Sequence, residues 1–376
     1  MRVCLDISPA LFRPAGIGRY VGALTGALLE HAGENEYVAF HNRAAEAALG
    51  SSFAGMGRLS TPHADKAWRL SILLAHLARL NQDHLFPGID VFHGADNLLP
   101  RVSRIRTVFT LHDLAFRLHP DTFTPLNRWY LRVMIPRFLR AADALLVDSE
   151  STRRDAARLY RVPQEKVRVV LPGVKSIFQP VTGRAHLEKV RSRYALPERF
   201  ILHVGTIEPR KNLETLFEAL RLLATREVKL VIAGRKGWFC EEIFARLARL
   251  GLESRVVFTG FVPDDDLPAL YSLAEVFAYP SLYEGFGLPP LEAMACGVPV
   301  LSSNSSSLPE VVGDAAILVA PEDVTGWKEA LERLLARPEL RASLRESGLR
   351  RASRFTWKAA ALKTREIYRE VYAHRP

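Results

Sequence analysis

Two glutamates flank a glycine-rich turn in the C-terminal half of the chain, from Glu284 through Gly285 and Gly287 to Glu292. The glycines permit close backbone approach, and the prolines between them and Glu292 suit the first turn of a helix, where a missing N–H is harmless. A glycine-rich turn before a helix N-terminus is a site for an anion such as a diphosphate. Glu284 in the loop and Glu292 in the first helical turn add acceptors for sugar hydroxyls. Taken singly, Glu292 would merely complement the helix dipole.

Alternating strands and helices must position this segment. At 376 residues the chain exceeds the size of a single hydrophobic core, so we expect two domains. Short apolar runs separated by amphipathic stretches predict parallel, doubly wound α/β sheets, whose ligands bind beyond the carboxyl ends of the strands. The runs that we interpret as strands of the C-terminal half are 200–205, 228–234, 256–260, 276–279, 299–302 and 316–320.

The N-terminal half repeats this pattern less clearly. We expect an N-terminal domain over residues 1–178 and a C-terminal one over 179–356, with a last helix over about 357–376 returning to the first domain. The N-terminal runs that we interpret as strands are 3–7, 36–40, 90–92, 107–111 and 144–147.

A string of motifs then resembles one enzyme family along nearly the whole chain. Glu284 and Glu292, with seven residues between them, resemble the E-x7-E motif of the retaining GT-B glycosyltransferases of family 4. That resemblance implies a GT-B fold and a nucleotide-sugar donor. Further strings that match the family's motifs are 16–20, 90–93, 111–113, 147–150, 205–212, 257–262 and 308–310.

The resemblance implies a role for each motif residue of the C-terminal domain. Glu292 should bind the ribose hydroxyls of the nucleotide and Glu284 the donor hexose. Arg210 and Lys211 should neutralise the diphosphate leaving group, which is the work of a metal ion in other transferases. The remaining donor-binding positions are Gly205, the loop at Phe261 and Val262 for the base, and the backbone N–H groups of Phe286, Gly287 and Leu288.

The N-terminal domain should add His112, which follows an apolar strand. The resemblance places this histidine beside the donor sugar, where it would support the transferred group. Gly16 should let the first loop approach the phosphate or the acceptor closely. For His93 and His203 we expect structural hydrogen bonds only, and for Ser149 a helix cap.

We expect no cofactor and no metal ion. The acidic run Asp264 to Asp266 has metal-binding spacing, but it precedes a helix, so capping and dipole compensation explain it better. The family retains anomeric configuration, and we expect front-side displacement in which the leaving diphosphate helps to deprotonate the acceptor.

Donor and acceptor are less sharply defined. The strings 208–212 and 281–295 look most like bacterial mannosyltransferases of polysaccharide assembly, which points to GDP-mannose; UDP-glucose and other hexose donors stay open. The acceptor would be a glycan or a lipid-linked sugar. The alternatives to a glycosyltransferase are a GT-B phosphorylase, an epimerase and a non-catalytic basic binding protein.

The formal net charge of +10 attracts anions in general. Without a recognisable nucleic-acid motif, nucleic acid is the weakest candidate. Residues 128–140 and 68–80 combine basic and apolar residues, so they could contact an anionic membrane or simply pack on a sheet. We expect a cytoplasmic protein, because no signal peptide is recognisable and the three cysteines have neither metal-binding nor disulfide spacing.

Overall fold

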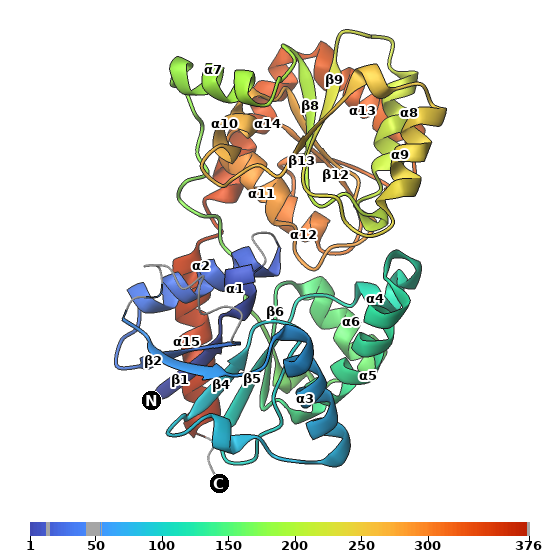
Figure 1. The fold of residues 1–376 in the computed structure, drawn as a ribbon. Helices are drawn as coiled ribbons and strands as arrows, with labels where there is room; N and C mark the ends of the chain where they lie inside the picture. Colours follow the sequence, from blue (N-terminus) through green and yellow to red (C-terminus); the bar gives the residue numbers. More distant parts are fainter. Residues whose placement is uncertain (13–15, 43–52, 54, 374–376) are drawn as a thin grey trace. The chain divides into compact units, whose positions relative to one another are not determined.

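A computed structural model describes residues 1–12, 16–42, 53 and 55–373 of the chain. It divides into two compact units, which are described separately (Figure 1). Unit 1 comprises residues 1–117, 125–173 and 356–376, and unit 2 comprises residues 118–124 and 174–355. The short segment 118–124 thus belongs to unit 2; the indole N–H of Trp238, for example, donates to the carbonyl of Thr122 (2.5 Å). The first long segment of unit 2 begins at Val174, a few residues before the boundary expected from the sequence.

In the described part of unit 1, seven parallel strands form one sheet in the order β3-β2-β1-β4-β5-β6-β7. Their bounds are β1 (Arg2–Asp6), β2 (Glu36–Asn42), β3 (Gly57–Thr61), β4 (Val91–Gly94), β5 (Arg106–Leu111), β6 (Ala144–Val147) and β7 (Val167–Val169). The helices are α1 (Ser8–Phe12), α2 (Ile17–Glu30), α3 (Asp65–Ala78), α4 (Ala115–Leu118), α5 (Pro125–Ala141), α6 (Glu150–Tyr160) and α15 (Trp357–Ala373), with short 3-10 turns η3 (Asp83–Leu85) and η5 (Gln164–Lys166). The 3-10 turn η4 (Pro120–Thr122) lies in the segment 118–124, which belongs to unit 2.

The last helix, α15, packs on α2 and against strands β4 and β5 of unit 1. Its buried residues Ile367 and Tyr368 belong to the same hydrophobic cluster as Val91 of β4 and Val108 of β5. A hydrogen bond of 2.6 Å joins the Tyr368 hydroxyl to Nδ1 of His93. The C-terminal helix is therefore part of the first unit's core.

In unit 2, six described strands form a second parallel sheet in the order β10-β9-β8-β11-β12-β13. The strands are β8 (Phe200–Val204), β9 (Lys229–Ala233), β10 (Val256–Gly260), β11 (Val276–Tyr279), β12 (Val300–Ser303) and β13 (Ala316–Val319). The helices are α7 (Arg184–Arg193), α8 (Leu213–Leu222), α9 (Cys240–Arg249), α10 (Leu267–Leu273), α11 (Leu288–Ala295), α12 (Leu308–Val312), α13 (Val324–Ala336) and α14 (Pro338–Ala352), with 3-10 turns η6 (Pro209–Lys211) and η7 (Glu253–Arg255).

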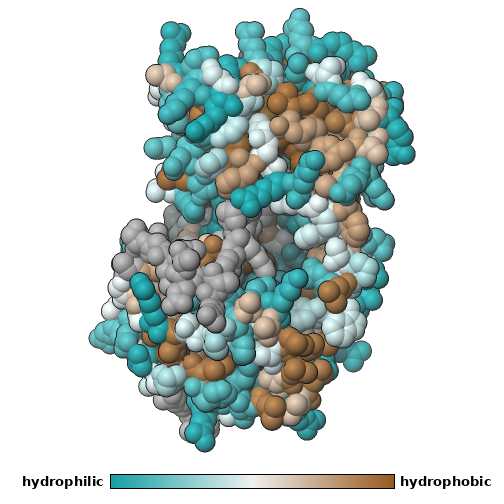
Figure 2. Space-filling model, in the orientation of Figure 1, coloured by the Kyte–Doolittle hydropathy of each residue, from teal (hydrophilic) through white to brown (hydrophobic). Residues whose placement is uncertain are grey.

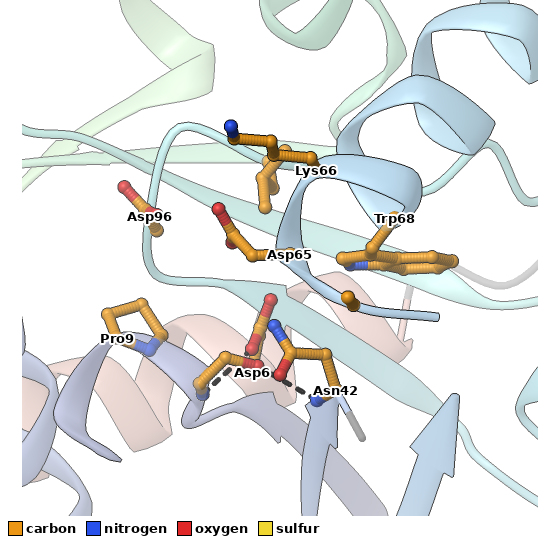
Figure 3. A pocket seen from close by; sticks show the side chains of 10 residues that line it. Asp6, Pro9, Asn42, Asp65, Lys66, Trp68 and Asp96 are labelled. Atoms are coloured by element: carbon orange, nitrogen blue, oxygen red, sulfur yellow. Dashed lines mark hydrogen bonds between the residues drawn. The ribbon is translucent and has the colours of Figure 1, made fainter. Parts of the chain in front are cut away.

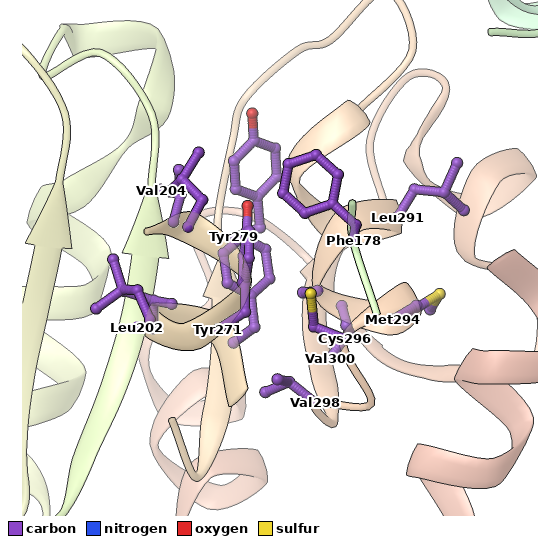
Figure 4. Close-up of a cluster of buried hydrophobic side chains, with 14 of the residues drawn as sticks. Phe178, Leu202, Val204, Tyr271, Tyr279, Leu291, Met294, Cys296, Val298 and Val300 are labelled. Atoms are coloured by element: carbon purple, nitrogen blue, oxygen red, sulfur yellow. The ribbon is translucent and has the colours of Figure 1, made fainter. Parts of the chain in front are cut away.

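Both faces of the unit 2 sheet are buried. Successive side chains of a strand point to opposite faces, so Leu202 enters the cluster that contains Tyr271 and Leu291, whereas its neighbour Ile201 enters the cluster of Phe217. Figure 4 shows the first cluster, in which strand residues meet α10 and α11. Burial on both faces explains why these strands are continuous apolar runs.

The predicted fold of two doubly wound parallel sheets is confirmed, and every strand expected in unit 2 forms. Two strands of unit 1 escaped prediction. β3 is largely exposed and polar, and β7 has three residues, so neither presents a long apolar run. The three cysteines are free and buried. Within the described residues, no helix has the length and apolar character needed to cross a bilayer.

Candidate functional site

Two loops of unit 2 bring Arg210, Lys211 and Glu284 together. Strands β8 and β11 pair at the centre of the sheet, and the chain continues from β8 to β9 on one side and from β11 to β12 on the other. Such a switch point is where open α/β sheets bind ligands. The loop after β8 carries Arg210 and Lys211 in η6, and the loop after β11 carries Glu284.

The side chain of Glu284 is buried and held by four others. Its Oε1 lies 2.6 Å from Lys211 Nζ, and its Oε2 lies 2.9 Å from Arg210 Nη1. The hydroxyl of Tyr279 donates to Oε1 at 3.0 Å, and the hydroxyl of Ser281 donates to the same atom. The carboxylate is therefore fixed in position before any ligand binds.

These contacts set the ionisation of the cluster. Burial alone would raise the pKa of Glu284, but the charges of Arg210 and Lys211 outweigh it and hold that pKa well below its usual range. Burial, helped by the charge of Arg210, lowers the pKa of Lys211, while Glu284 opposes that shift. Glu284 is consequently a carboxylate at any physiological pH. It can accept hydrogen bonds, but it cannot act as a general acid.

Both cations of the cluster have carboxylate partners. Arg210 contacts Glu208 (Nη2 to Oε1, 2.8 Å) as well as Glu284, and it also donates to the carbonyl of Tyr283 at 2.7 Å. Two positive side chains thus stand opposite two negative ones. A diphosphate at this place would compete with Glu284 for Arg210 and Lys211, which would release Glu284 oxygens to accept from sugar hydroxyls.

Asn212 joins the loops around this cluster. Its backbone is left-handed (φ 54°), and its side-chain amide donates to the carbonyls of Pro280 (3.1 Å) and Pro321 (2.7 Å). Asparagine tolerates this backbone conformation better than most residues. One side chain thereby connects the loops that follow β8, β11 and β13.

The start of α11 offers backbone N–H groups, rather than side chains, to a ligand. Gly287 precedes it with φ of +114°, and a Cβ there would lie 2.7 Å from Leu308 Cδ2, so only glycine fits. No side chain in the described part of the chain caps this helix. The ring of Phe286 packs edge-on against Phe355 in the core, and Leu288 is partly buried. The predicted donor contacts of residues 286–288 therefore depend on their N–H groups.

Glu292 lies in the second turn of α11, so the expectation that it occupies the first turn was wrong. A helix-dipole role is correspondingly weaker, because the dipole acts within the first turn. The side chain is 3% exposed, and the Tyr271 hydroxyl donates to its Oε2 at 3.1 Å.

Each motif glutamate is thus anchored by a tyrosine of the hydrophobic core. Tyr271 reaches Glu292 from α10, and Tyr279 reaches Glu284 from the end of β11. Both rings lie in the cluster of Figure 4. The packing of unit 2 therefore determines where the two carboxylates stand.

The loop expected to hold the base follows β10. Phe261 is 38% exposed, and the Arg235 guanidinium carbon lies 4.4 Å from its ring centre, a cation–π contact. Val262 is buried in the core. Only the backbone of Val262 is therefore available to a base, whereas Phe261 and Arg235 offer side-chain surface.

Gly205 lies where the loop after β8 crosses the loop after β9. A Cβ on Gly205 would approach His203 Nε2 to 3.2 Å, and a Cβ on Gly234 would lie 1.8 Å from the Gly205 carbonyl oxygen. The two backbones touch, so Gly234 admits no side chain.

In unit 1, His112 follows β5 and pairs with Asp148, which follows β6. His112 Nδ1 lies 2.6 Å from Asp148 Oδ2, and Nε2 lies 3.0 Å from the carbonyl oxygen of Ala95. Both ring nitrogens face acceptors, so the geometry requires both protons. Burial alone would lower the pKa of His112, but the Asp148 carboxylate raises it to about 9. His112 is an imidazolium at neutral pH, and its predicted role beside the donor stays a prediction.

Gly16 precedes α2 with φ of +54°, a conformation that favours glycine, and a Cβ there would meet no atom of the described residues within 4 Å. The two histidines for which structural hydrogen bonds were expected, His93 and His203, form them. His93 bonds Tyr368 and Thr110. His203 bonds the carbonyl of Ala278 and stacks on Tyr279. Ser149 caps α6 by accepting from the N–H of Thr152 at 3.0 Å.

The capping role expected for the acidic run 264–266 was wrong. Asp266 precedes α10 but accepts from Arg193 and Tyr194 instead (both 2.7 Å), and Asp264 pairs with Lys175 at 2.7 Å. These carboxylates are stabilised by partners distant in sequence. Within the residues that the structure describes, no group of three or more histidine, cysteine, aspartate or glutamate side chains is placed to hold a metal ion.

Sequence reasoning missed several residues of these clusters. Three of them lie inside motif strings that the sequence analysis recognised: Glu208, Ser281 and Asp148. Each follows the end of a strand, and this position could have identified it as a site residue. Tyr271 had no such signal. His119 was also missed: its ring lies 5.8 Å from that of Tyr283, and burial, with the charge of Arg210, lowers its pKa.

Comparison with known proteins agrees with this architecture. Residues 188–351 match the family Glycosyl transferases group 1, and residues 14–176 match Glycosyltransferase Family 4. Among solved structures, sucrose-phosphate synthase of Thermosynechococcus elongatus shares the fold over 100% of both chains (TM-score 0.78, 24% identity). WaaG, a glycosyltransferase involved in lipopolysaccharide biosynthesis, does so over 98% of this chain and 99% of its own (TM-score 0.73, 18% identity).

Similar sequences include O-antigen chain mannosyltransferase B of Escherichia coli, 35% identical over 74% of each chain. The serotype-specific mannosyltransferase WbdA of Escherichia coli is 35% identical over 67% of this chain, which spans only 32% of that longer protein. With this similarity, the two family matches and the GT-B architecture, the chain belongs to glycosyltransferase family 4 and is a glycosyltransferase.

Proposed function

We propose that this glycosyltransferase moves mannose from GDP-mannose to a hydroxyl of a glycan or lipid-linked acceptor in polysaccharide or lipopolysaccharide assembly, with retention of configuration and without a metal ion. The observation that carries the proposal is the Glu284 carboxylate held between Arg210 and Lys211. This cluster offers two cations to a diphosphate and a carboxylate to a sugar. The similarity to O-antigen chain mannosyltransferase B supports mannose as the sugar.

The proposed role of Glu284 supports front-side displacement. A two-step scheme would need Glu284 as a nucleophile at the anomeric carbon, whereas here its oxygens, released from Arg210 and Lys211 by the diphosphate, accept hydrogen bonds from ring hydroxyls of the sugar. In the proposed step the bond from the anomeric carbon to the diphosphate oxygen breaks, and a bond to the acceptor oxygen forms on the same face. The acceptor proton passes to the departing diphosphate. Arg210 and Lys211 stabilise the charge that develops there.

The alternative donors are UDP-hexoses. HepE of Anabaena, solved with UDP and glucose, has the same fold (TM-score 0.75, 20% identity), and similarity at that level does not select a base. A phosphorylase or an epimerase would use the same architecture, but neither would release nucleotide only when an acceptor is present.

A thermal-shift panel of GDP, UDP, ADP and dTDP sugars tests the donor, and the donor that stabilises most is then assayed for transfer. We expect GDP-mannose to stabilise most, GDP release to depend on an acceptor, and the product to keep the α configuration by NMR. The rate should be unchanged in EDTA. Stronger stabilisation by a UDP sugar would replace the proposed donor, and loss of the rate in EDTA would overturn metal independence.

We also propose that unit 1 rests on an anionic lipid surface, at the cytoplasmic face of a membrane. On α3, Leu70, Leu74 and Leu77 repeat at helical spacing along one face, and each is more than half exposed. Leu80, just beyond α3, is 62% exposed, and Figure 2 shows the resulting hydrophobic patch over this helix. Exposed patches of this kind mark interaction surfaces.

The neighbouring helix extends this surface. α5 packs beside α3 through His76 and Phe138 (ring centres 5.2 Å apart) and exposes Leu126 and Trp129. Exposed basic residues lie close to these apolar ones along the chain: Lys66 precedes Leu70 by four residues, Arg79 directly precedes Leu80, and Arg132 follows Trp129 by three. Apolar side chains flanked by cations are typical of interfacial helices.

Flotation with phosphatidylglycerol-containing vesicles tests this contact. The double variant Leu74→Gln/Leu77→Gln should lose binding, whereas Leu222→Gln, an exposed leucine of α8, should keep it. Equal binding of both variants would overturn the proposal.

A further inference from the structure

A serine-rich loop begins at the end of β12 and runs along the loop after β11. Its residues 303–307, the serine loop, read Ser-Asn-Ser-Ser-Ser and carry no charge. The hydroxyl of Ser303 donates to the carbonyl of Ser281 at 2.6 Å, and the hydroxyl of Ser305 donates to the carbonyl of Leu282. Side chains of one loop therefore hold consecutive backbone groups of the other.

The next two serines hold the backbone of Glu284 itself. The N–H of Glu284 donates to Oγ of Ser306 at 2.8 Å. The hydroxyl of Ser307, which is buried, lies 2.9 Å from the carbonyl oxygen of Glu284 and 2.7 Å from that of Phe286. Both backbone groups of Glu284 thus have a serine partner, in addition to the four side chains that hold its carboxylate.

Ser306 makes its contact from an unfavourable backbone conformation. Its φ is +52°, in the left-handed region that residues other than glycine rarely adopt. Such strain persists only where the surrounding structure determines it, and it gathers at functional sites. Glycine would adopt this conformation at lower cost, but it would lack the oxygen that accepts from Glu284. A serine at this position therefore indicates that the hydroxyl is the group that matters.

The loop after β1, at the switch point of the unit 1 sheet, is held by a charged group instead. Asp6 Oδ1 accepts from the N–H of Ser8 at 3.0 Å. Figure 3 shows Asp6 in a pocket of about 430 Å³ that Asp65 and Asp96 also line. A carboxylate used in this way beside a diphosphate would repel it. The uncharged serine loop fixes a backbone without that penalty, which suits a place that must receive an anion.

The serine loop matters most once the donor is bound. In the proposed function the diphosphate takes Arg210 and Lys211, so the Glu284 carboxylate loses its two cationic partners. The backbone contacts with the serine loop are then left to hold Glu284, together with the hydroxyls of Tyr279 and Ser281. Precise placement is valuable here, because a shift of about 1 Å in a reacting group can cost about 10²-fold in rate.

We propose that Ser306 is a positioning residue of the donor site: its hydroxyl fixes the backbone of Glu284, so that the released carboxylate meets the sugar hydroxyls in the geometry of the transition state. The inference rests on the proposed function and names a further residue on which that reaction depends. Ser306 acts through Glu284 and not on the reacting atoms. Its loss should therefore lower kcat and leave the KM for the donor unchanged.

Ser306→Gly tests the proposal, because glycine accepts the left-handed backbone and removes only the hydroxyl. With the nucleotide sugar that the chain uses as donor, we expect kcat to fall by about tenfold, as for the loss of one hydrogen bond. The KM for the donor should stay the same, and the melting temperature should stay the same or rise. Ala195→Gly is the matched control: Ala195 is also left-handed (φ +48°), is exposed and follows α7 in unit 2, so this variant should keep the natural kcat.

A double variant separates positioning from a general defect. If Ser306 acts through Glu284, then Ser306→Gly should lower kcat no further in a chain that already carries Glu284→Ala. Equal losses with and without Glu284 would overturn the proposal. So would a natural kcat in Ser306→Gly, or a raised KM for the donor in place of a lowered kcat.

Hydrogen exchange adds a readout that does not depend on transfer. The amide of Glu284 should exchange faster in Ser306→Gly than in the natural chain or in Ala195→Gly, because it loses its acceptor. Unchanged exchange at this amide would also overturn the proposal. If exchange responds as expected but the natural chain transfers no hexose from any nucleotide sugar, the proposed function fails, whereas the contact between Ser306 and Glu284 stands.

Discussion

The buried charged clusters of the two units differ in how their charges are shared. In unit 2, the carboxylate of Glu284 is shared between Arg210 and Lys211. In the described part of unit 1, the imidazolium of His112 forms an ion pair with Asp148. When one cation of the unit 2 cluster is removed, Glu284 keeps the other, whereas breaking a one-to-one buried pair leaves a charge uncompensated. The pair of unit 1 should therefore tolerate substitution less well than the cluster of unit 2.

The largest expected effect concerns the ion pair of unit 1. Asp148→Asn removes the charged partner of His112 while keeping a similar shape. Breaking a buried pair leaves a buried charge uncompensated, so we expect a loss of about 3–5 kcal/mol in the free energy of unfolding. Urea denaturation at pH 7 measures it. Glu370→Gln, which breaks the exposed pair with Arg168, should change stability by less than about 0.5 kcal/mol. If Asp148→Asn loses as little free energy of unfolding as Glu370→Gln, then His112 is not a buried imidazolium that depends on Asp148.

The same pair predicts a pH dependence. The pKa of His112 is raised to about 9 in the folded protein, above the ordinary value of 6.5. Its contribution to stability is therefore complete below about pH 6.5 and is lost as the pH rises through about 9. Unfolding curves between pH 6 and 10 should show this loss in the natural chain and not in Asp148→Asn. If stability changes with pH in the same way in the natural chain and in Asp148→Asn, the pKa of His112 is not raised by Asp148.

The next effect concerns catalysis in unit 2. Glu284→Ala should lower kcat by about 10³-fold, near the upper end for one stabilising group in a buried site, while nucleotide binding is largely kept. Glu227→Ala, at a side chain that is 82% exposed, is the matched control. Near-normal turnover by Glu284→Ala would remove this residue from the mechanism.

A smaller loss is expected from one cation of the cluster. Lys211→Met keeps the buried hydrocarbon chain but removes the charge, and Arg210 still pairs with Glu284. We expect kcat to fall by about 10²-fold, or about 2.7 kcal/mol of transition-state stabilisation. Lys328→Met, at a helix surface, should retain the full rate. If Lys211→Met lowers only the affinity for the donor, the residue binds the ground state and transition state equally.

The sequence predicted unit 2 better than unit 1 for a physical reason. The strands of unit 2 are buried on both faces, so each is a continuous apolar run that can be recognised in the sequence. The residues that follow these strands lie in short contiguous motifs. In unit 1, β3 is polar and exposed, and His112 pairs with Asp148, which lies 36 residues further along the chain. Only the fold brings them together. The hydroxyl contact from Tyr271 to Glu292 was equally beyond prediction, because it depends on how α10 packs against α11.

The smallest effect compares two helix starts. Ser149 accepts from the N–H of Thr152 at the start of α6, whereas α11 begins at Gly287 without a side-chain cap in the described structure. Ser149→Ala leaves that N–H without its acceptor and should lower stability by about 1 kcal/mol, and Ser149→Gly by only a few tenths. Urea denaturation distinguishes the two. The Ser149 side chain thus occupies one N–H group at the start of α6, whereas no described side chain caps α11, whose N–H groups an anion can bind. Equal stability of Ser149→Ala and the natural chain would show that the cap does not stabilise α6.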